Sequence, residues 1–107
     1  MREDLLEIIG NYGVPHQLKK LNEEMFEFCE AVLEYHNRKD SVEEEEREKL
    51  MEHIYEEYGD VEVVLSQFKY LYNLDLVKLE ENKSRKILRQ RLRMIEENDK
   101  KFNNIHK

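Results

Sequence analysis

The sequence predicts an all-α protein, and three observations support this fold class. The 107 residues contain only three glycines and one proline, and all four lie within the first 59 positions. Helix-favouring Glu, Lys, Leu and Arg are abundant. Apolar residues recur at steps of three and four, as on one face of a helix. We therefore expect a four-helix-type bundle in one domain that spans residues 1–107, with its core at about 14–97, and that oligomerisation completes.

The first two helices are placed by breaker residues. Residues 2–9 form a short amphipathic helix, which the segment from Gly10 to Gly13 ends. Pro15 suits the first turn of a second helix, where its missing N–H costs nothing, and this helix is expected to end near Arg38. Its predicted apolar stripe is Leu18, Leu21, Met25, Phe28, Val32 and Tyr35.

A polar turn precedes the third helix. Ser41 and Glu44 have the spacing of a capping box, so the third helix is expected to begin there. A fourth helix is expected from about Leu76 to Glu97, followed by a frayed polar tail. The stripe of the third helix is Leu50, Ile54, Glu57, Val61, Val64, Phe68 and Leu71, and one of its members is an acid.

That acid, Glu57, is the first sign of a functional site. A buried carboxylate must be paired, protonated or bound to a metal, because desolvating it alone costs several kcal/mol. Glu57 also stands three residues before Asp60, just as Glu24 stands three before Glu27 on the second helix. Residues at this spacing share a helix face, so each helix presents two carboxylates together.

The two acidic pairs are predicted to face each other. A short turn makes the second and third helices antiparallel, and residues at one depth then have position numbers with a constant sum. Glu24 with Asp60 and Glu27 with Glu57 share the same sum. A turn centred near residue 40 predicts a slightly smaller sum, so we expect the third helix to overhang by about one turn, roughly 6 Å, through the acidic residues 43–46.

Four converging carboxylates favour a hard divalent cation. The cation relieves their mutual repulsion, and all-oxygen ligands indicate Mg²⁺ or Mn²⁺ rather than zinc or copper. Two alternatives compete with this interpretation. Glu-rich helices contain many such acid pairs by chance on solvated faces, as expected for residues 43–46. A ferritin-like di-iron site needs Glu-x-x-His, and none of the four histidines has a Glu three residues before it.

These residues also resemble a known family. The EEMFE segment at residues 23–27 and the EYGD segment at residues 57–60 resemble the EExxE…ExxD pattern of the MazG-like all-α nucleoside triphosphate pyrophosphohydrolases. The flanking segments HQLKKLNEEMFEFCEAV and EEYGDVEVVL are similar to those of the family, and the resemblance covers roughly residues 14–97.

The resemblance implies a Mg²⁺-dependent hydrolase that converts a nucleoside triphosphate to the monophosphate and pyrophosphate, as in nucleotide-pool house-cleaning. By motif position, Glu24, Glu27, Glu57 and Asp60 would be the metal ligands, and Glu23 would orient a ligand or the attacking water. Related families act on phosphoribosyl-ATP or on pyrimidine deoxynucleoside triphosphates with similar carboxylates, so the substrate stays open among these.

Basic and polar residues are candidates for binding the phosphates. Residues 83–93 contain six basic residues and no acid. A metal-bound triphosphate needs further positive charge, and Lys83, Lys86 and either Arg89 or Gln90 lie along one side of a helix. The family has a Lys and an Arg in its last core helix, so the resemblance implies Lys83, Lys86 and Arg89 for this role. The competing interpretation is a solvated basic face. Gln17 and Lys20 are further candidates for substrate contact.

Composition limits the partners and the compartment. The formal net charge of −7 disfavours nucleic acid and anionic membranes as partners. One cysteine and no segment that resembles a signal peptide suit a cytoplasmic protein. We expect a homodimer or homotetramer. The rival function is a non-catalytic helical module that dimerises or binds a partner through the same amphipathic helices.

Overall fold

The structure is a computed structural model that describes residues 1–105. Four helices make up most of the chain: α1 (Arg2–Tyr12), α2 (Val14–Arg38), α3 (Glu44–Leu71) and α4 (Leu76–Ile105). Residues 1–105 contain no strand, so the predicted all-α class is confirmed. The chain divides into two compact units, Met1–Asn73 and Leu74–Lys107. The prediction of one domain across all 107 residues stays a prediction.

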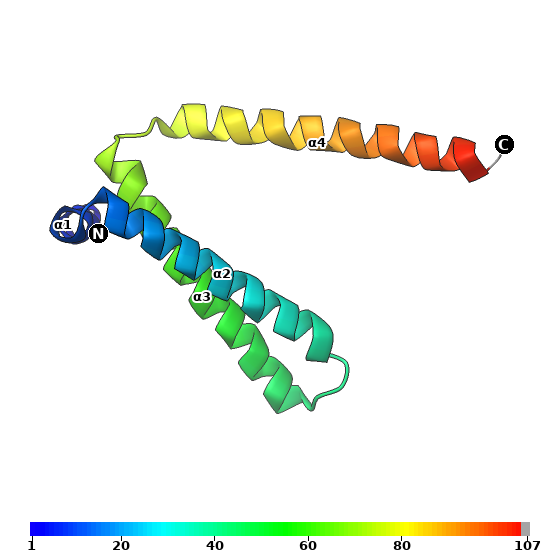
Figure 1. The fold of residues 1–107 in the computed structure, drawn as a ribbon, viewed down its shortest axis with the longest axis horizontal. Helices are drawn as coiled ribbons and strands as arrows, with labels where there is room; N and C mark the ends of the chain where they lie inside the picture. The colour runs from blue at the N-terminus through cyan, green and yellow to red at the C-terminus, as the bar shows by residue number, and fades with distance from the viewer. Residues whose placement is uncertain (106–107) are drawn as a thin grey trace. The chain divides into compact units, whose positions relative to one another are not determined.

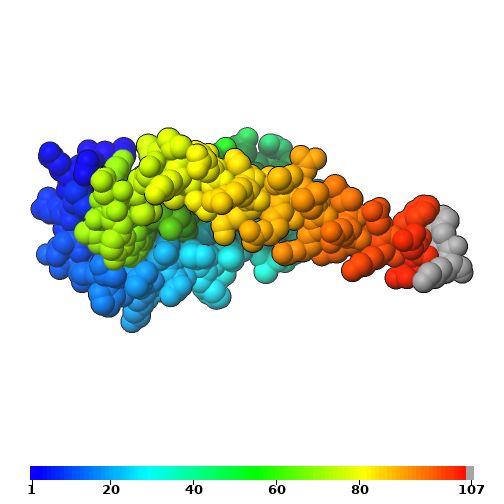
Figure 2. All heavy atoms as spheres, turned by 90° about the horizontal axis from the view of Figure 1, so that it is seen from above, coloured from blue at the N-terminus to red at the C-terminus, as the bar shows by residue number. Residues whose placement is uncertain are grey.

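The first unit is built on the antiparallel pair of α2 and α3 (Figure 1). Helix α1 lies across one end of this pair, beside the C-terminal end of α3, where blue and yellow-green atoms adjoin (Figure 2). Each helix contributes apolar side chains to a small core, and burying such side chains is the main stabilising term. The buried apolar residues of the described chain are Leu5, Ile9, Ala31, Leu50 and Val64.

One glycine connects α1 to α2. Gly13 has a φ of 88°, in the left-handed region that side chains rarely adopt, and its N–H bonds to the carbonyl of Ile9 at 2.8 Å. Pro15 lies in the first turn of α2, as predicted. The expectation that Gly10 already breaks α1 is wrong, because the helix continues to Tyr12. A glycine inside a helix costs only about 1 kcal/mol relative to alanine.

The connection between α2 and α3 differs from the expectation in two ways. Ser41 does not cap α3, because its hydroxyl donates backwards to the carbonyl of Arg38 at 3.1 Å and α3 begins at Glu44. The first turn of α3 also overhangs α2 by less than the predicted turn, because Glu46, the third residue of α3, lies beside the last residue of α2. Arg38 reaches Glu46 at 3.5 Å, and Arg47 Nε donates to the carbonyl of Lys39 at 2.8 Å. The connecting residues 39–43 are centred one residue later than predicted, which supplies the rest of the register shift.

The inward face of α2 is shifted by one residue from the predicted stripe. Leu18, Met25 and Val32 are exposed, whereas their neighbours Gln17, Glu24 and Ala31 are buried. The predicted members Leu21, Phe28 and Tyr35 are half-buried. Two polar residues occupy inward positions, so a count of apolar residues selects the wrong row. The stripe of α3 is largely confirmed, with Leu50 and Val64 buried and Glu57 part-buried between them.

The second unit consists of α4. Asp75 caps this helix, because its Oδ1 accepts hydrogen bonds from the backbone N–H of Val77 at 2.8 Å and of Lys78 at 3.4 Å. The helix continues past the predicted end at Glu97 to Ile105, since no glycine or proline interrupts residues 98–105. Within residues 1–105, no helix combines the length and the apolar composition needed to cross a bilayer.

Candidate metal centre

Three acidic side chains converge between α2 and α3. Glu24 on α2 and Glu57 and Asp60 on α3 each offer a carboxylate oxygen, and these three atoms lie within 4.8 Å of one another. The predicted register therefore holds for Glu24 and Asp60. The same register is kept about two helical turns away, where Gln17 Nε2 donates a hydrogen bond of 2.8 Å to Gln67 Oε1. These two residues have the same position sum.

Two of these carboxylates are removed from water. The side chains of Glu24 and Glu57 are 7% and 13% exposed. One oxygen of each has a partner, since Lys20 Nζ lies 2.7 Å from Glu24 Oε1 and His53 Nε2 lies 3.1 Å from Glu57 Oε1. The other oxygen, Oε2, is buried in both residues and has no hydrogen-bond partner in the part of the chain that the structure describes. Buried oxygens without a partner are costly, so they call for a ligand.

The charges of the cluster perturb the groups around it. Desolvation raises the pKa of Asp60 above its ordinary value, and the negative charges of Glu24 and Glu57 raise it further. The negative charge of Glu24 is also the main cause of the raised pKa of the exposed Glu27 carboxyl. The hydrogen bond to Glu24 raises the pKa of the Lys20 ammonium. The cluster therefore carries more negative charge than the Lys20 ammonium balances.

The residues present fit a hard divalent cation. Carboxylate oxygens are the donors that Mg²⁺ and Mn²⁺ prefer. Oxygen ligands on opposite sides of Mg²⁺ lie roughly 4.2 Å apart, so side chains whose oxygens already lie within 4.8 Å need only small rotations to share one ion. A cation at this position would also satisfy the two buried Oε2 atoms.

An open cleft adjoins the carboxylates within the first unit. It has a volume of about 570 Å³ and lies among α1, α2 and α3. Glu24, Asp60 and Lys20 line it where it meets the metal centre, and the hydrogen-bonded Gln17 and Gln67 line it further along. Its remaining lining residues are Ile8, Tyr12, His16, Val63 and Val64.

The predicted ligands and contact residues on α2 differ in burial and in their distance from the cluster. Glu24 lies in the cluster. Glu27 is exposed and outside the group of three, yet the charges of Glu24 and Glu57 raise its pKa, so its role as a ligand stays a prediction. Glu23 is exposed as well, and its charge only adds to the raised pKa of Lys20. Gln17 and Lys20, predicted to touch substrate, both line the cleft beside the carboxylates.

The predicted phosphate-binding cations belong to the second unit. Lys83, Lys86 and Arg89 lie on one side of α4 and line the same shallow hollow of about 410 Å³, together with Ile87, Gln90 and Arg93. Their shared helix face is thus confirmed, and their role with a triphosphate stays a prediction.

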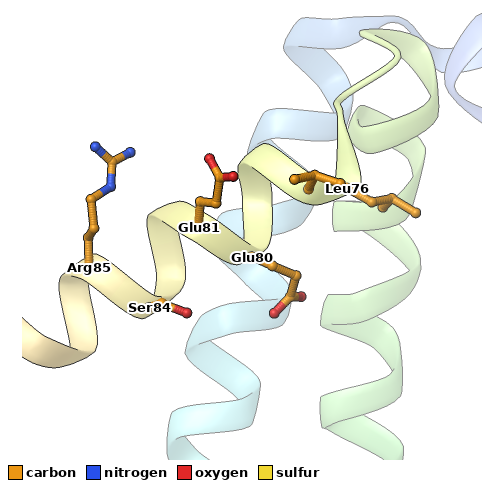
Figure 3. A pocket seen from close by; sticks show the side chains of 6 residues that line it. Leu76, Glu80, Glu81, Ser84 and Arg85 are labelled. Carbon is orange, nitrogen blue, oxygen red and sulfur yellow. The ribbon is translucent and has the colours of Figure 1, made fainter.

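A second hollow on α4, of about 710 Å³, does not bring together side chains that could form a binding site. All six of its lining residues come from that one helix, and the carboxylates of Glu80 and Glu81 point in opposite directions (Figure 3).

Three polar or aromatic residues that line the cleft, Tyr12, His16 and Gln67, were not among the predicted site residues. Gln67 has a signal that the sequence contains, because it shares the position sum of the two acidic pairs with Gln17. Tyr12 and His16 have no such signal. They stack with ring centroids 4.8 Å apart and an interplanar angle of 16°, and this contact spans the turn at Gly13.

Comparisons with known proteins identify no family for this chain. A scan against protein-family models, a search of curated proteins and a search of solved structures each found no match.

Proposed function

We propose that the protein is a Mg²⁺-dependent hydrolase that cleaves a nucleoside triphosphate to the monophosphate and pyrophosphate. The observation that supports this function is the pair of buried, unpartnered Oε2 atoms of Glu24 and Glu57 beside Asp60. Buried carboxylate oxygens without a partner reduce stability, and sequences tolerate such a cost mainly at functional sites. The open cleft next to these acids provides space for a ligand of nucleotide size.

The chain's own residues have distinct parts in this reaction. Bound Mg²⁺ or Mn²⁺ would supply positive charge at the phosphate oxygens and a more acidic water. Lys20 lines the cleft beside Glu24, so its ammonium is placed to pair with a phosphate. Water attacks one phosphorus, and the P–O bond to pyrophosphate breaks. Glu27, an exposed carboxylate three residues after Glu24 on α2, is placed to accept the proton that the water loses.

The family proposal follows from the motifs. The EEMFE and EYGD segments supply Glu24, Glu57 and Asp60 to one cluster, and this juxtaposition supports membership of the MazG-like pyrophosphohydrolases. Phosphoribosyl-ATP and pyrimidine deoxynucleoside triphosphates remain alternative substrates under the same proposal, because they present the same phosphate chemistry to the carboxylates.

Oligomerisation is part of the proposal. Leu18, Met25 and Val32 recur every seven residues on α2 and are exposed. This apolar row suits a contact with a second copy of the chain. The same row favours the rival function, a non-catalytic interaction module. The rival predicts that Mg²⁺ and nucleotide leave the unfolding temperature unchanged, whereas a nucleotide hydrolase is stabilised by both.

The direct test is pyrophosphate release from a panel of ribo- and deoxyribonucleoside triphosphates and phosphoribosyl-ATP, with and without Mg²⁺. The Glu57→Gln variant is expected to lose at least about 100-fold of the activity. Glu56→Gln is the matched control, because Glu56 is the adjacent residue on α3 and is exposed outside the cluster. Equal rates in wild type and Glu57→Gln would defeat the proposal.

A further inference from the structure

The cleft contains a buried amide pair that the metal centre does not explain. Gln17 and Gln67 are each almost fully buried, at 3% and 2% exposure. Their mutual hydrogen bond uses Nε2 of Gln17 and Oε1 of Gln67, and His16 Nδ1 lies 2.8 Å from Gln17 Oε1. These contacts hold both amides in place and leave Nε2 of Gln67 available to donate to a ligand. Because both residues line the cleft, an occupant would meet a preset hydrogen-bonding edge.

An aromatic pair lies on the wall of the same cleft. Tyr12 stacks on His16, yet more than half of the Tyr12 residue, 55%, stays exposed. The neighbouring wall is apolar, with Ile8 on α1 and Val63 on α3. A flat heterocycle gains most from this combination, since aromatic surface stacks on its face while amides bond to its edge.

The spacing along the helices relates this region to the metal centre. Gln17 precedes Glu24 by seven residues on α2, and Gln67 follows Asp60 by seven residues on α3. Seven residues of helix rise by roughly 10 Å. The amide pair and the carboxylates thus stand at two ends of one cleft, separated as the base and the phosphates of an extended nucleotide are.

We propose that this end of the cleft is a nucleoside subsite, in which Tyr12 stacks on the base and the Gln17–Gln67 pair hydrogen-bonds to its edge. The inference rests on the proposed function, because it assigns the base and sugar of the same substrate. Tyr12, His16 and Gln67 become residues that determine specificity, and Lys20 lies between them and the acids.

The test measures nucleoside binding without phosphate or metal. Adenosine, guanosine, cytidine, uridine and thymidine are titrated in EDTA, and the side-chain amide signals of Gln17 and Gln67 are followed by ¹H–¹⁵N NMR. At least one nucleoside is expected to shift both signals. Tyr12→Ala is expected to raise its dissociation constant about tenfold. Tyr72→Ala is the matched control, because Tyr72 is 58% exposed and stacks on Phe68 outside the cleft.

A second variant addresses the amides. Gln67→Leu is expected to weaken the same nucleoside by a similar factor, and circular dichroism verifies that the variant keeps its helices. If Gln67→Leu unfolds, Tyr12→Ala alone decides, because that side chain is exposed. The proposal is overturned if none of the five nucleosides shifts the two amide signals, or if Tyr12→Ala binds as wild type does.

The outcome is separable from that of the proposed function. Nucleoside binding that depends on Tyr12, without pyrophosphate release from any triphosphate, supports the subsite and defeats the hydrolase. Pyrophosphate release with the same KM in wild type and Tyr12→Ala supports the hydrolase and defeats the subsite.

Discussion

Helix α3 carries two groups of acidic residues whose surroundings differ. Its first turn holds Glu44, Glu45 and Glu46, which are exposed or half-exposed and lie near the positive end of the helix dipole. Each has a basic partner: Arg47 at 2.6 Å, Lys49 at 4.0 Å and Arg38 at 3.5 Å, respectively. Further along, Glu57 and Asp60 turn toward another acid, Glu24, and two buried oxygens there have no partner among residues 1–105.

This comparison shows that a high number of acidic residues is not enough to form a cation site. Exposed ion pairs are worth about 0–1 kcal/mol and are already neutralised, so the first turn of α3 has little to gain from a metal. In the second group Lys20 and His53 pair with one oxygen each of Glu24 and Glu57, but the buried Oε2 atoms of these two acids lack a partner in the described part of the chain. A cation would remove that cost. The two groups should therefore respond differently to metal and to substitution, and the contrast is largest for metal affinity.

Substitutions in the two groups should change metal affinity by very different factors. Glu24→Gln removes a carboxylate from the cluster and is expected to weaken Mn²⁺ binding by about 100-fold, as measured by isothermal titration calorimetry. Replacement of Glu44, Glu45 and Glu46 together by Gln is expected to change the affinity less than twofold. If the triple variant lost more Mn²⁺ affinity than Glu24→Gln, the metal would bind at the first turn of α3, and the assignment to Glu24, Glu57 and Asp60 would be wrong.

The second contrast is thermal. At a Mn²⁺ concentration ten times its dissociation constant, binding stabilises the folded state by about 1.4 kcal/mol. For a domain of this size the unfolding temperature should rise by about 5–10 °C. Differential scanning fluorimetry should show the same rise in the triple first-turn variant and none in Asp60→Asn, and a rise retained by Asp60→Asn would contradict the assignment.

The third contrast concerns the metal-free protein. Glu57→Gln should increase the free energy of unfolding by about 1 kcal/mol in EDTA, because the amide removes a negative charge and donates to a neighbouring carboxylate. Glu45→Gln should change it by less than about 0.5 kcal/mol, since this side chain is exposed. Urea titration measures both. If Glu57→Gln lowered the free energy of unfolding in EDTA, the carboxylates would not destabilise the metal-free protein, and the account of the cluster would be wrong.

The smallest effect is on the pH dependence of stability. The pKa values of Asp60 and Glu27 are raised in the folded protein, so the folded state holds their protons more tightly than the unfolded state does. Their contribution to the metal-free stability should therefore fall as the pH rises from about 4, near the ordinary carboxyl pKa, through the raised values. Asp60→Asn should flatten this slope in urea titrations, and Glu45→Gln should not.

Much of the site could be predicted because helix geometry is regular. An acid at an apolar position, Glu57, and the constant position sum are enough to place Glu24 opposite Asp60 from the sequence alone. The same rule extends to Gln17 and Gln67, whose hydrogen bond fixes the register. These inferences depend on the rise and period of an α-helix, together with the acidic pairs that indicate the register.

The remaining features depend on tertiary packing. The inward row of α2 passes through Gln17 and Glu24, so hydrophobic periodicity points one residue away from it. The start of α3 is decided by contacts of Arg47 with the loop rather than by Ser41. The stacking of Tyr12 on His16 follows from the direction that the chain takes at Gly13, which no residue pattern encodes.

Paramagnetic broadening by Mn²⁺ in ¹H–¹⁵N NMR spectra tests the central claim most directly, because it reports the ion's position without reference to activity. Substoichiometric Mn²⁺ should broaden the amide signals around Glu24, Glu57 and Asp60 first, and leave those of residues 43–46 sharp. Broadening that centres on residues 43–46, or that spreads evenly over all the acidic residues, would contradict a metal centre between α2 and α3.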